Sequence, residues 1–206
     1  MQIENFTNSY FIPQGPAEAE QVIKRNRFIC YVQRAVDKSA AQEFINQIKS
    51  DHPGARHWCW AYIAGNPKST TDIGMTDDGE PHGTAGKPML SVLQYSDIGE
   101  IAAIVVRYSS GIKLGTGGLV RAYQSSVQLA LDELDTVEKI DMVYVDVQYP
   151  YNCEEGVRNF ASSNSLEIMN VEYLNNVRVK LKLPARDKQC LMDELQDVVN
   201  GRAIIF

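Results

Sequence analysis

The order of strand and helix signals in the last third of the chain restricts its fold more than any other feature. From about residue 138 the sequence reads as strand, helix, strand, strand, helix and strand. Apolar and polar residues alternate through Met142–Tyr149, and Asn175-Asn176 separate two strand-like runs as a hairpin turn does. Because a βαββαβ order is that of the ferredoxin-like fold, we expect a ferredoxin-like domain over residues 137–206.

Residues 1–136 mix strands with helices, which indicates a second α+β domain. The run Phe28–Val36 is apolar and β-branched enough for a strand. A helical pattern follows, with Asp37 or Ser39 as a suitable cap, and it stops at Pro53. At 206 residues the chain is long enough for two such domains.

The stretch RHWCWAYIAG is a predicted strand whose two faces differ in chemistry. His57 and Cys59 share one face about 7 Å apart, too far for a Cys–His nucleophile pair, and no spacing supports a zinc site. Ordinary buried or half-buried side chains are the better interpretation of this pair. Trp58, Trp60 and Tyr62 share the other face, which either packs beneath a helix or, if open, stacks nucleic-acid bases.

Two glycine-rich loops are candidate anion sites. The first, DDGEPHGTAGKPML, is not a P-loop, because Pro81 stands five residues before Gly86 and Pro88 follows Lys87. The amides of Thr84–Lys87 are still expected near a helix N-terminus, where an anion binds weakly. The alternative is that the glycines only turn the chain and Pro88 starts a helix.

The second loop, SSGIKLGTGG, follows a wholly apolar strand that ends near Arg107, and it precedes a long helix. Val120 stands where a dinucleotide-binding fingerprint needs its third glycine, so that kind of site is excluded. Lys113 and Arg121 lie beside the loop, with Thr116 as a suitable helix cap, so the loop suits a phosphodiester or ribosomal RNA backbone. Turn formation alone is again the alternative. The predicted anion- or nucleic-acid-binding residues are Thr84, Gly86, Lys87, Arg107, Gly111, Lys113, Gly115, Thr116, Gly117, Gly118 and Arg121.

Asp77, Asp78, Glu80 and His82 offer a different chemistry within the first loop. Such a set can hold Mg²⁺ or supply an acid and a base, in an enzyme acting on a small phosphorylated or peptide substrate. Carboxylates in a Gly- and Pro-rich loop also serve as solvated turn formers. Nothing else in the chain completes a catalytic set, so no catalytic residue, metal ligand or cofactor is predicted.

The charge balance limits how nucleic acid can bind. The chain has 20 basic and 26 acidic residues, a net charge of −6, and no basic tail or arm. Binding must therefore come from a local patch. The basic stretch IKRNRF and the alternating cations of VRVKLKL both qualify, with a solvated surface as the alternative for each.

Nothing in the sequence predicts a membrane partner or export. No run approaches the length of a membrane span, and the N-terminus lacks a basic region followed by an apolar stretch. The four cysteines are scattered without a CxxC pair, which favours reduced thiols in the cytoplasm.

The motifs HPGARHWCWAY, DDGEPHGTAGKPML and GEIAAIVVRYSSGIKLGTGGLVRAY, with the C-terminal pattern, resemble the IMPACT family in its bacterial, YigZ-type form. The resemblance covers nearly the whole chain. It implies a ribosomal-protein-like α/β sandwich followed by a ferredoxin-like domain, a pair similar to two consecutive domains of elongation factor G. It also implies a link to translation, because eukaryotic members regulate translation in amino-acid starvation by competing for an activator of a stress kinase.

The sequence departs from the family pattern after Arg107, where Ser109 and Ser110 replace an aromatic residue and a glycine. If the double glycine allows close approach to RNA, this chain achieves it less well. The chain also lacks the extra domain through which eukaryotic members contact their partner, so that interaction is not expected. The expected function is a non-enzymatic protein that binds RNA or the ribosome and modulates translation, with docking of a protein partner on the C-terminal sheet as an alternative.

Overall fold

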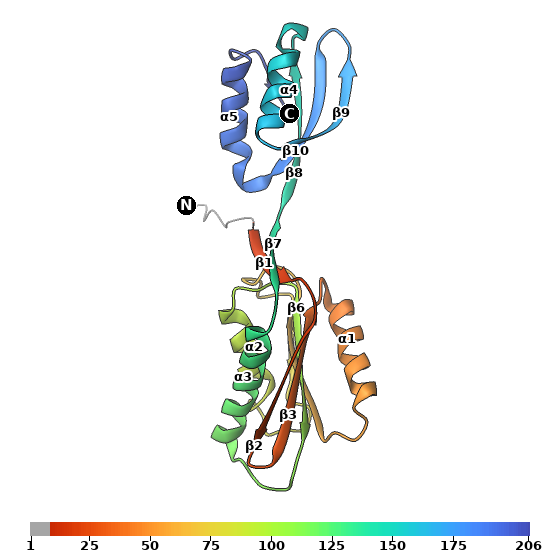
Figure 1. The fold of residues 1–206 in the computed structure, drawn as a ribbon, viewed down its shortest axis with the longest axis vertical. Helices are drawn as coiled ribbons and strands as arrows, with labels where there is room; N and C mark the ends of the chain where they lie inside the picture. Colours follow the sequence, from red (N-terminus) through yellow and green to blue (C-terminus); the bar gives the residue numbers. More distant parts are fainter. Residues whose placement is uncertain (1–8) are drawn as a thin grey trace. The chain divides into compact units, whose positions relative to one another are not determined.

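The computed structural model describes residues 9–206, which divide into two compact units (Figure 1). The N-terminal unit comprises Tyr10–Lys139, and the C-terminal unit comprises Ile140–Phe206 together with Ser9. Strands β1 (Ser9–Pro13) and β7 (Thr136–Ile140) pair in a two-stranded sheet. The predicted domain boundary between residues 136 and 137 falls inside β7.

A five-stranded sheet forms the centre of the N-terminal unit. Its order is β2-β3-β6-β4-β5, and every neighbouring pair is antiparallel. Strand β6 lies in the middle, and its residues from Ile101 to Arg107 are all buried because helices cover both faces of the sheet. The strands are β2 (Ala17–Ile23), β3 (Asn26–Arg34), β4 (His57–Ile63), β5 (Ile73–Thr76) and β6 (Ile101–Tyr108).

Three helices cover this sheet. Helix α1 (Lys38–Asp51) packs on one face, and α2 (Gly86–Tyr95) and α3 (Thr116–Asp132) pack on the other (Figure 1). The predicted cap of α1 is confirmed for Asp37, whose carboxylate accepts a hydrogen bond from the Ala40 amide at 2.8 Å. No helix among residues 9–206 combines the length and apolar character needed to cross a membrane.

The aromatic face of β4 packs beneath α1. Trp58, Trp60 and Tyr62 belong to a hydrophobic cluster with Phe44 and Ile45 of that helix. The rings of Trp60 and Tyr62 also stack on each other, with centroids 5.8 Å apart. The packing interpretation is therefore the correct one, since this face contacts a helix rather than standing free for bases.

The C-terminal unit has the predicted ferredoxin-like fold. Its antiparallel sheet has the order β11-β8-β10-β9, and its two helices pack on one face of the sheet. The loop between β9 and β10 comprises Leu174–Asn176, so it is longer than the predicted Asn-Asn turn. The elements are β8 (Met142–Tyr149), α4 (Glu154–Ser163), β9 (Glu167–Tyr173), β10 (Val177–Pro184), α5 (Lys188–Val198) and β11 (Ile204–Ile205).

Candidate functional site

A cleft of about 420 Å³ opens at one end of the sheet in the N-terminal unit. Antiparallel pairing places the end of β6 beside the start of β4, so Arg107 lies opposite His57. The loop after β6 leads into α3 along a second wall, and the segment before α2 supplies a third. The cleft thus gathers side chains from distant parts of the sequence. Its lining comprises Arg56, His57, residues 79–81, Arg107, Ser109, residues 111–116 and Leu119.

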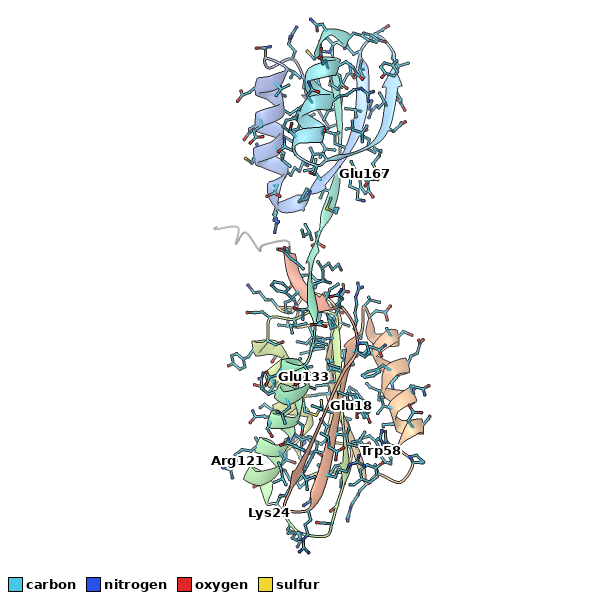
Figure 2. The ribbon with its side chains drawn as sticks, viewed as in Figure 1. Glu18, Lys24, Trp58, Arg121, Glu133 and Glu167 are labelled. Carbon is cyan, nitrogen blue, oxygen red and sulfur yellow. The ribbon has the colours of Figure 1, made fainter. Side chains whose placement is uncertain are left out.

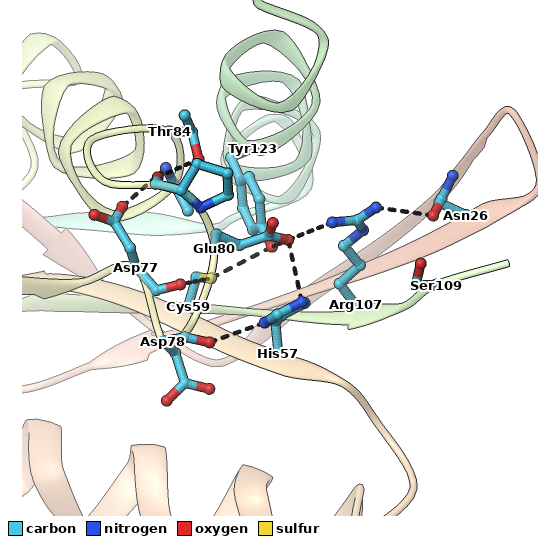
Figure 3. Close-up of polar contacts among 12 residues, drawn as sticks. Asn26, His57, Cys59, Asp77, Asp78, Glu80, Thr84, Arg107, Ser109 and Tyr123 are labelled. Atoms are coloured by element: carbon cyan, nitrogen blue, oxygen red, sulfur yellow. Dashed lines mark hydrogen bonds and ion pairs between the residues drawn. The ribbon is translucent and has the colours of Figure 1, made fainter. Parts of the chain in front are cut away.

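A buried ion pair forms the floor of the cleft (Figure 3). Glu80 Oε1 accepts hydrogen bonds from Arg107 Nη1 at 2.5 Å and from the Tyr123 hydroxyl at 2.8 Å. Arg107 Nη2 donates to the buried Asn26 side chain at 2.9 Å. Burial raises the pKa of Tyr123, so its hydroxyl stays protonated and donates. The network fixes the end of β6 against the segment before α2.

His57 and Cys59 face the same side of β4 and point into different surroundings. The Asp78 carbonyl can only accept a hydrogen bond, so His57 Nδ1 donates to it at 2.9 Å. His57 Nε2 then faces Glu80 Oε1 at 3.9 Å. The Cys59 thiol donates to the Asp77 carbonyl at 2.9 Å, and burial raises the pKa of this thiol. A buried thiol of that kind is a poor nucleophile, and His57 alone of the pair lines the cleft.

The first glycine-rich loop already has an anionic partner within the chain. The Asp77 carboxylate accepts hydrogen bonds from the amides of Gly83, Ala85 and Gly86 at 2.7, 3.0 and 2.9 Å. Partial burial alone would raise the pKa of Asp77, but these amides outweigh it and hold the pKa below its usual value. Asp77 therefore caps the start of α2, and this geometry argues against an external anion at the predicted Gly86 amide.

The predicted anion-binding residues of the first loop, Thr84, Gly86 and Lys87, do not line the cleft. Thr84 is buried, and its hydroxyl donates to the Pro81 carbonyl at 2.6 Å. Lys87 is exposed on α2. Asp78 accepts from the Trp58 amide at 2.8 Å, and the His82 side chain is fully exposed. Among the four acidic and imidazole side chains considered for catalysis, only that of Glu80 lines the cleft.

The second glycine-rich loop does line the cleft, through Gly111, Lys113, Gly115 and Thr116. Helix α3 begins there with Gly115 at its N-cap position, where φ is 74°, and no side chain of residues 9–206 caps the helix. The expectation that Thr116 caps the helix is wrong, because Thr116 is already the first helical residue. The N–H groups of the first turn thus have no partner within the helix. They lie at its N-terminal end, which attracts anions.

A second hollow of about 330 Å³ lies on the other side of Leu114, which lines both. Lys24 and Arg121 line it, and Figure 2 shows both at the end of the unit where β2 turns into β3. Arg56 and Lys113 line the cleft, and the start of α3 contributes residues to both hollows. We call Lys24, Arg56, Lys113 and Arg121 the basic rim. No carboxylate of residues 9–206 forms an ion pair with any of the four.

Some of this site escaped sequence reasoning. Arg56 and Tyr123 lie within motifs quoted above and Asn26 lies within the basic stretch IKRNRF, but their roles in the site come from neighbours far away in the sequence. His57 was considered only with Cys59, although its partners are Asp78 and Glu80. In the part of the chain that the structure describes, no group of three or more His, Cys, Asp or Glu side chains is placed to hold a metal ion.

Comparisons with known proteins match both units. The Impact N-terminal domain matches residues 24–131, and a domain of unknown function (DUF1949) matches residues 147–202. A solved structure described as a hypothetical protein is 38% identical, covers 98% of both chains and has a TM-score of 0.67.

Curated relatives match over nearly their whole length. An IMPACT family member of Haemophilus influenzae is 40% identical over 95% of both chains. The IMPACT family member YigZ of Escherichia coli is 39% identical, over 94% of this chain and 95% of its own. YvyE of Bacillus subtilis is 35% identical, over 96% of this chain and 90% of its own. The chain therefore belongs to the IMPACT family.

Proposed function

We propose that this chain is a non-enzymatic protein that binds RNA or the ribosome and modulates translation. The contact is made by the basic rim and the start of α3, which hold backbone phosphates. The observation that carries the proposal is that four cations without an ion-pair partner among residues 9–206 line the two hollows beside the start of α3, in a chain whose net charge is −6.

The pairing of charges distinguishes the rim from the other basic surface of the chain. On β10, Arg178 and Lys180 lie 3.6 and 3.8 Å from Asp146, and Lys182 forms an ion pair at 2.9 Å with a glutamate of β9. Those cations are already partly neutralised. A cation without a carboxylate partner is free to replace the counterions of a phosphate, which is the source of affinity for a nucleic-acid backbone.

The start of α3 complements the rim. Its first-turn amides point out of the helix end, and Gly117 and Gly118 add no side chain over them. Backbone amides and cations together hold phosphate oxygens without reading bases. We therefore expect binding with little sequence preference, as suits a protein that follows the backbone of ribosomal RNA. The link to translation rests on the family resemblance, since eukaryotic members regulate translation.

An enzyme built on Asp77, Asp78, Glu80 and His82 receives less support. Asp77 is occupied as a helix cap, and Asp78 is bonded to β4. Only Glu80 reaches the cleft, and its carboxylate is committed to Arg107 and Tyr123 through Oε1.

Co-sedimentation with ribosomes tests the proposal. The variant Lys113→Ala with Arg121→Ala removes one cation from each hollow, and it should lower the bound fraction at low salt several-fold. Lys38→Ala with Lys188→Ala is the matched control, because it removes the same charge from the first residues of α1 and α5. The proposal fails if wild-type protein does not sediment with ribosomes at low salt, or if both double variants bind as well as wild type.

A further inference from the structure

The cleft presents hydrogen-bond acceptors as well as cations. Both hydrogen bonds that the Glu80 carboxylate accepts from residues 9–206 go to Oε1, and Oε2 accepts none from them. Within that range the fully buried polar side-chain atoms without a partner are Trp58 Nε1, Arg107 Nε and Gln196 Oε1. Glu80 Oε2 is not one of them, although the side chain is only 3% exposed. The small exposed part of Glu80 therefore includes an unbonded oxygen in the cleft that Glu80 lines.

His57 supplies a second acceptor next to the first. Its Nδ1 hydrogen is committed to the Asp78 carbonyl, so Nε2 of the neutral imidazole carries a lone pair. This nitrogen has no hydrogen-bond partner among the described residues and is not fully buried. Glu80 Oε2 and His57 Nε2 are thus two acceptors on one cleft floor, each without a donor.

These two free acceptors restrict the chemical group of a ligand that can bind to the cleft floor. A backbone phosphodiester has no hydrogen to donate to these acceptors, so phosphates belong at the rim and at the start of α3. The group on the floor must instead be a neutral hydrogen-bond donor that lies close to a phosphate. Pro81 and Leu119 give the same cleft an apolar wall, which suits the carbon skeleton of a sugar.

We infer that the cleft floor binds the ribose 2′-hydroxyl of an RNA strand and thereby selects RNA over DNA. This inference rests on the proposed function, since it places the RNA backbone at the basic rim. The 2′-hydroxyl is a donor that adjoins every backbone phosphate whatever the base, and it distinguishes RNA from DNA. It donates to Glu80 Oε2 or to His57 Nε2, while the neighbouring phosphate contacts Lys113 and the α3 amides.

The test compares three single strands of one sequence: RNA, DNA, and RNA whose 2′-hydroxyls are methylated. Binding to the full chain is measured by fluorescence anisotropy at fixed low salt. A hydrogen bond to a charged acceptor is worth about tenfold in affinity, so RNA should bind about tenfold more tightly than DNA. Methylated RNA should bind like DNA, because the methyl group removes the donor.

The variant Glu80→Gln tests the residue itself. The amide oxygen can replace Oε1 as the acceptor for Arg107 and Tyr123, while the amide nitrogen turns the free acceptor into a donor. The RNA-to-DNA affinity ratio should fall towards one in this variant. It should stay unchanged in Glu172→Gln, which makes the same substitution at an exposed position of β9.

Equal affinity of wild-type protein for RNA and DNA overturns the inference but leaves backbone binding intact. Tight binding of methylated RNA also overturns it, and this arm needs no variant to fold. A full RNA preference in folded Glu80→Gln protein overturns the assignment to Glu80. If neither RNA nor DNA binds, the proposed function fails with the inference.

Discussion

The ion pair between Arg107 and Glu80 should dominate the stability of the N-terminal unit. In Arg107→Met the guanidinium is lost but the apolar stem is kept. Glu80 then remains almost fully buried, the Tyr123 hydroxyl is the one donor to its carboxylate left among residues 9–206, and the Asn26 oxygen loses its Arg107 donor. Removing one partner of a buried pair costs about 3–5 kcal/mol, because the other charge is left desolvated.

The expected loss of stability follows from the burial of the ion pair rather than from its hydrogen-bond geometry. An exposed ion pair of the same chain serves as the control. Arg27 and Glu20 form two hydrogen bonds of 2.7 Å each, comparable in length to the 2.5 Å bond of the buried pair. The Arg27 side chain is 49% exposed, whereas that of Arg107 is 7% exposed. Water and salt screen the exposed pair, so Arg27→Met should change stability far less than Arg107→Met.

Urea unfolding followed by tryptophan fluorescence measures this difference in the relevant unit. Both tryptophans of the chain lie on β4, so the signal reports the N-terminal unit. Adding Glu80→Gln to Arg107→Met should recover part of the loss, since a neutral amide is less costly to bury than an unpaired carboxylate. If Arg107→Met lowers stability no more than Arg27→Met, or if adding Glu80→Gln causes a second full loss instead of a recovery, the cost does not come from a buried unpaired charge.

Three further predictions concern the starts of helices α2 and α3. Asp77→Asn should destabilise the protein by about 1 kcal/mol near neutral pH, through loss of a charged helix cap. The folded-state pKa of Asp77 is lowered, so its stabilisation is present above the unfolded pKa and is lost as pH falls through the folded value. The gap between wild type and variant in urea titrations should therefore shrink in acid, and a gap that grows there would contradict the assignment. Gly117→Ala should stabilise α3 by about 0.5 kcal/mol, since a Cβ there meets nothing within 4 Å and alanine favours a helix. Gly86→Ala should instead destabilise by about 1–3 kcal/mol, because its Cβ would lie 2.7 Å from the Thr76 carbonyl oxygen. Thermal melting of the two variants should move in opposite directions, and a shift of equal sign would show that the local packing is described incorrectly.

Sequence patterns predicted those helices and strands whose residues have the same kind of surroundings from one end of the element to the other. Strand β6 is apolar throughout because both of its faces are covered, and the βαββαβ order of the C-terminal unit leaves few other folds. Strand β2 was not predicted. Its sequence AEAEQVI is rich in alanine and glutamate, which favour helices, and it is a strand because it pairs with β3 along one edge of the sheet.

The site was less predictable because its chemistry depends on tertiary pairing. The composition of a loop that binds an external anion is the same as that of a loop that binds its own aspartate. Nothing local shows that Asp77 folds back onto the Gly86 amide, nine residues later. Arg107 was predicted to bind an anion or nucleic acid, whereas the structure buries its side chain in an ion pair with Glu80. This pair and the free acceptors of the cleft floor follow only from the pairing of β4 with β6.

The salt dependence of single-stranded RNA binding shows whether the basic rim contacts backbone phosphates. If the four cations of the basic rim contact phosphates, the slope of log K against log salt concentration should be about −2.8. Lys113→Ala with Arg121→Ala should reduce that slope to about −1.4, whereas Lys38→Ala with Lys188→Ala should leave it unchanged. A slope near zero in wild-type protein, or an equal slope in the two double variants, would contradict the assignment of the basic rim as the RNA contact.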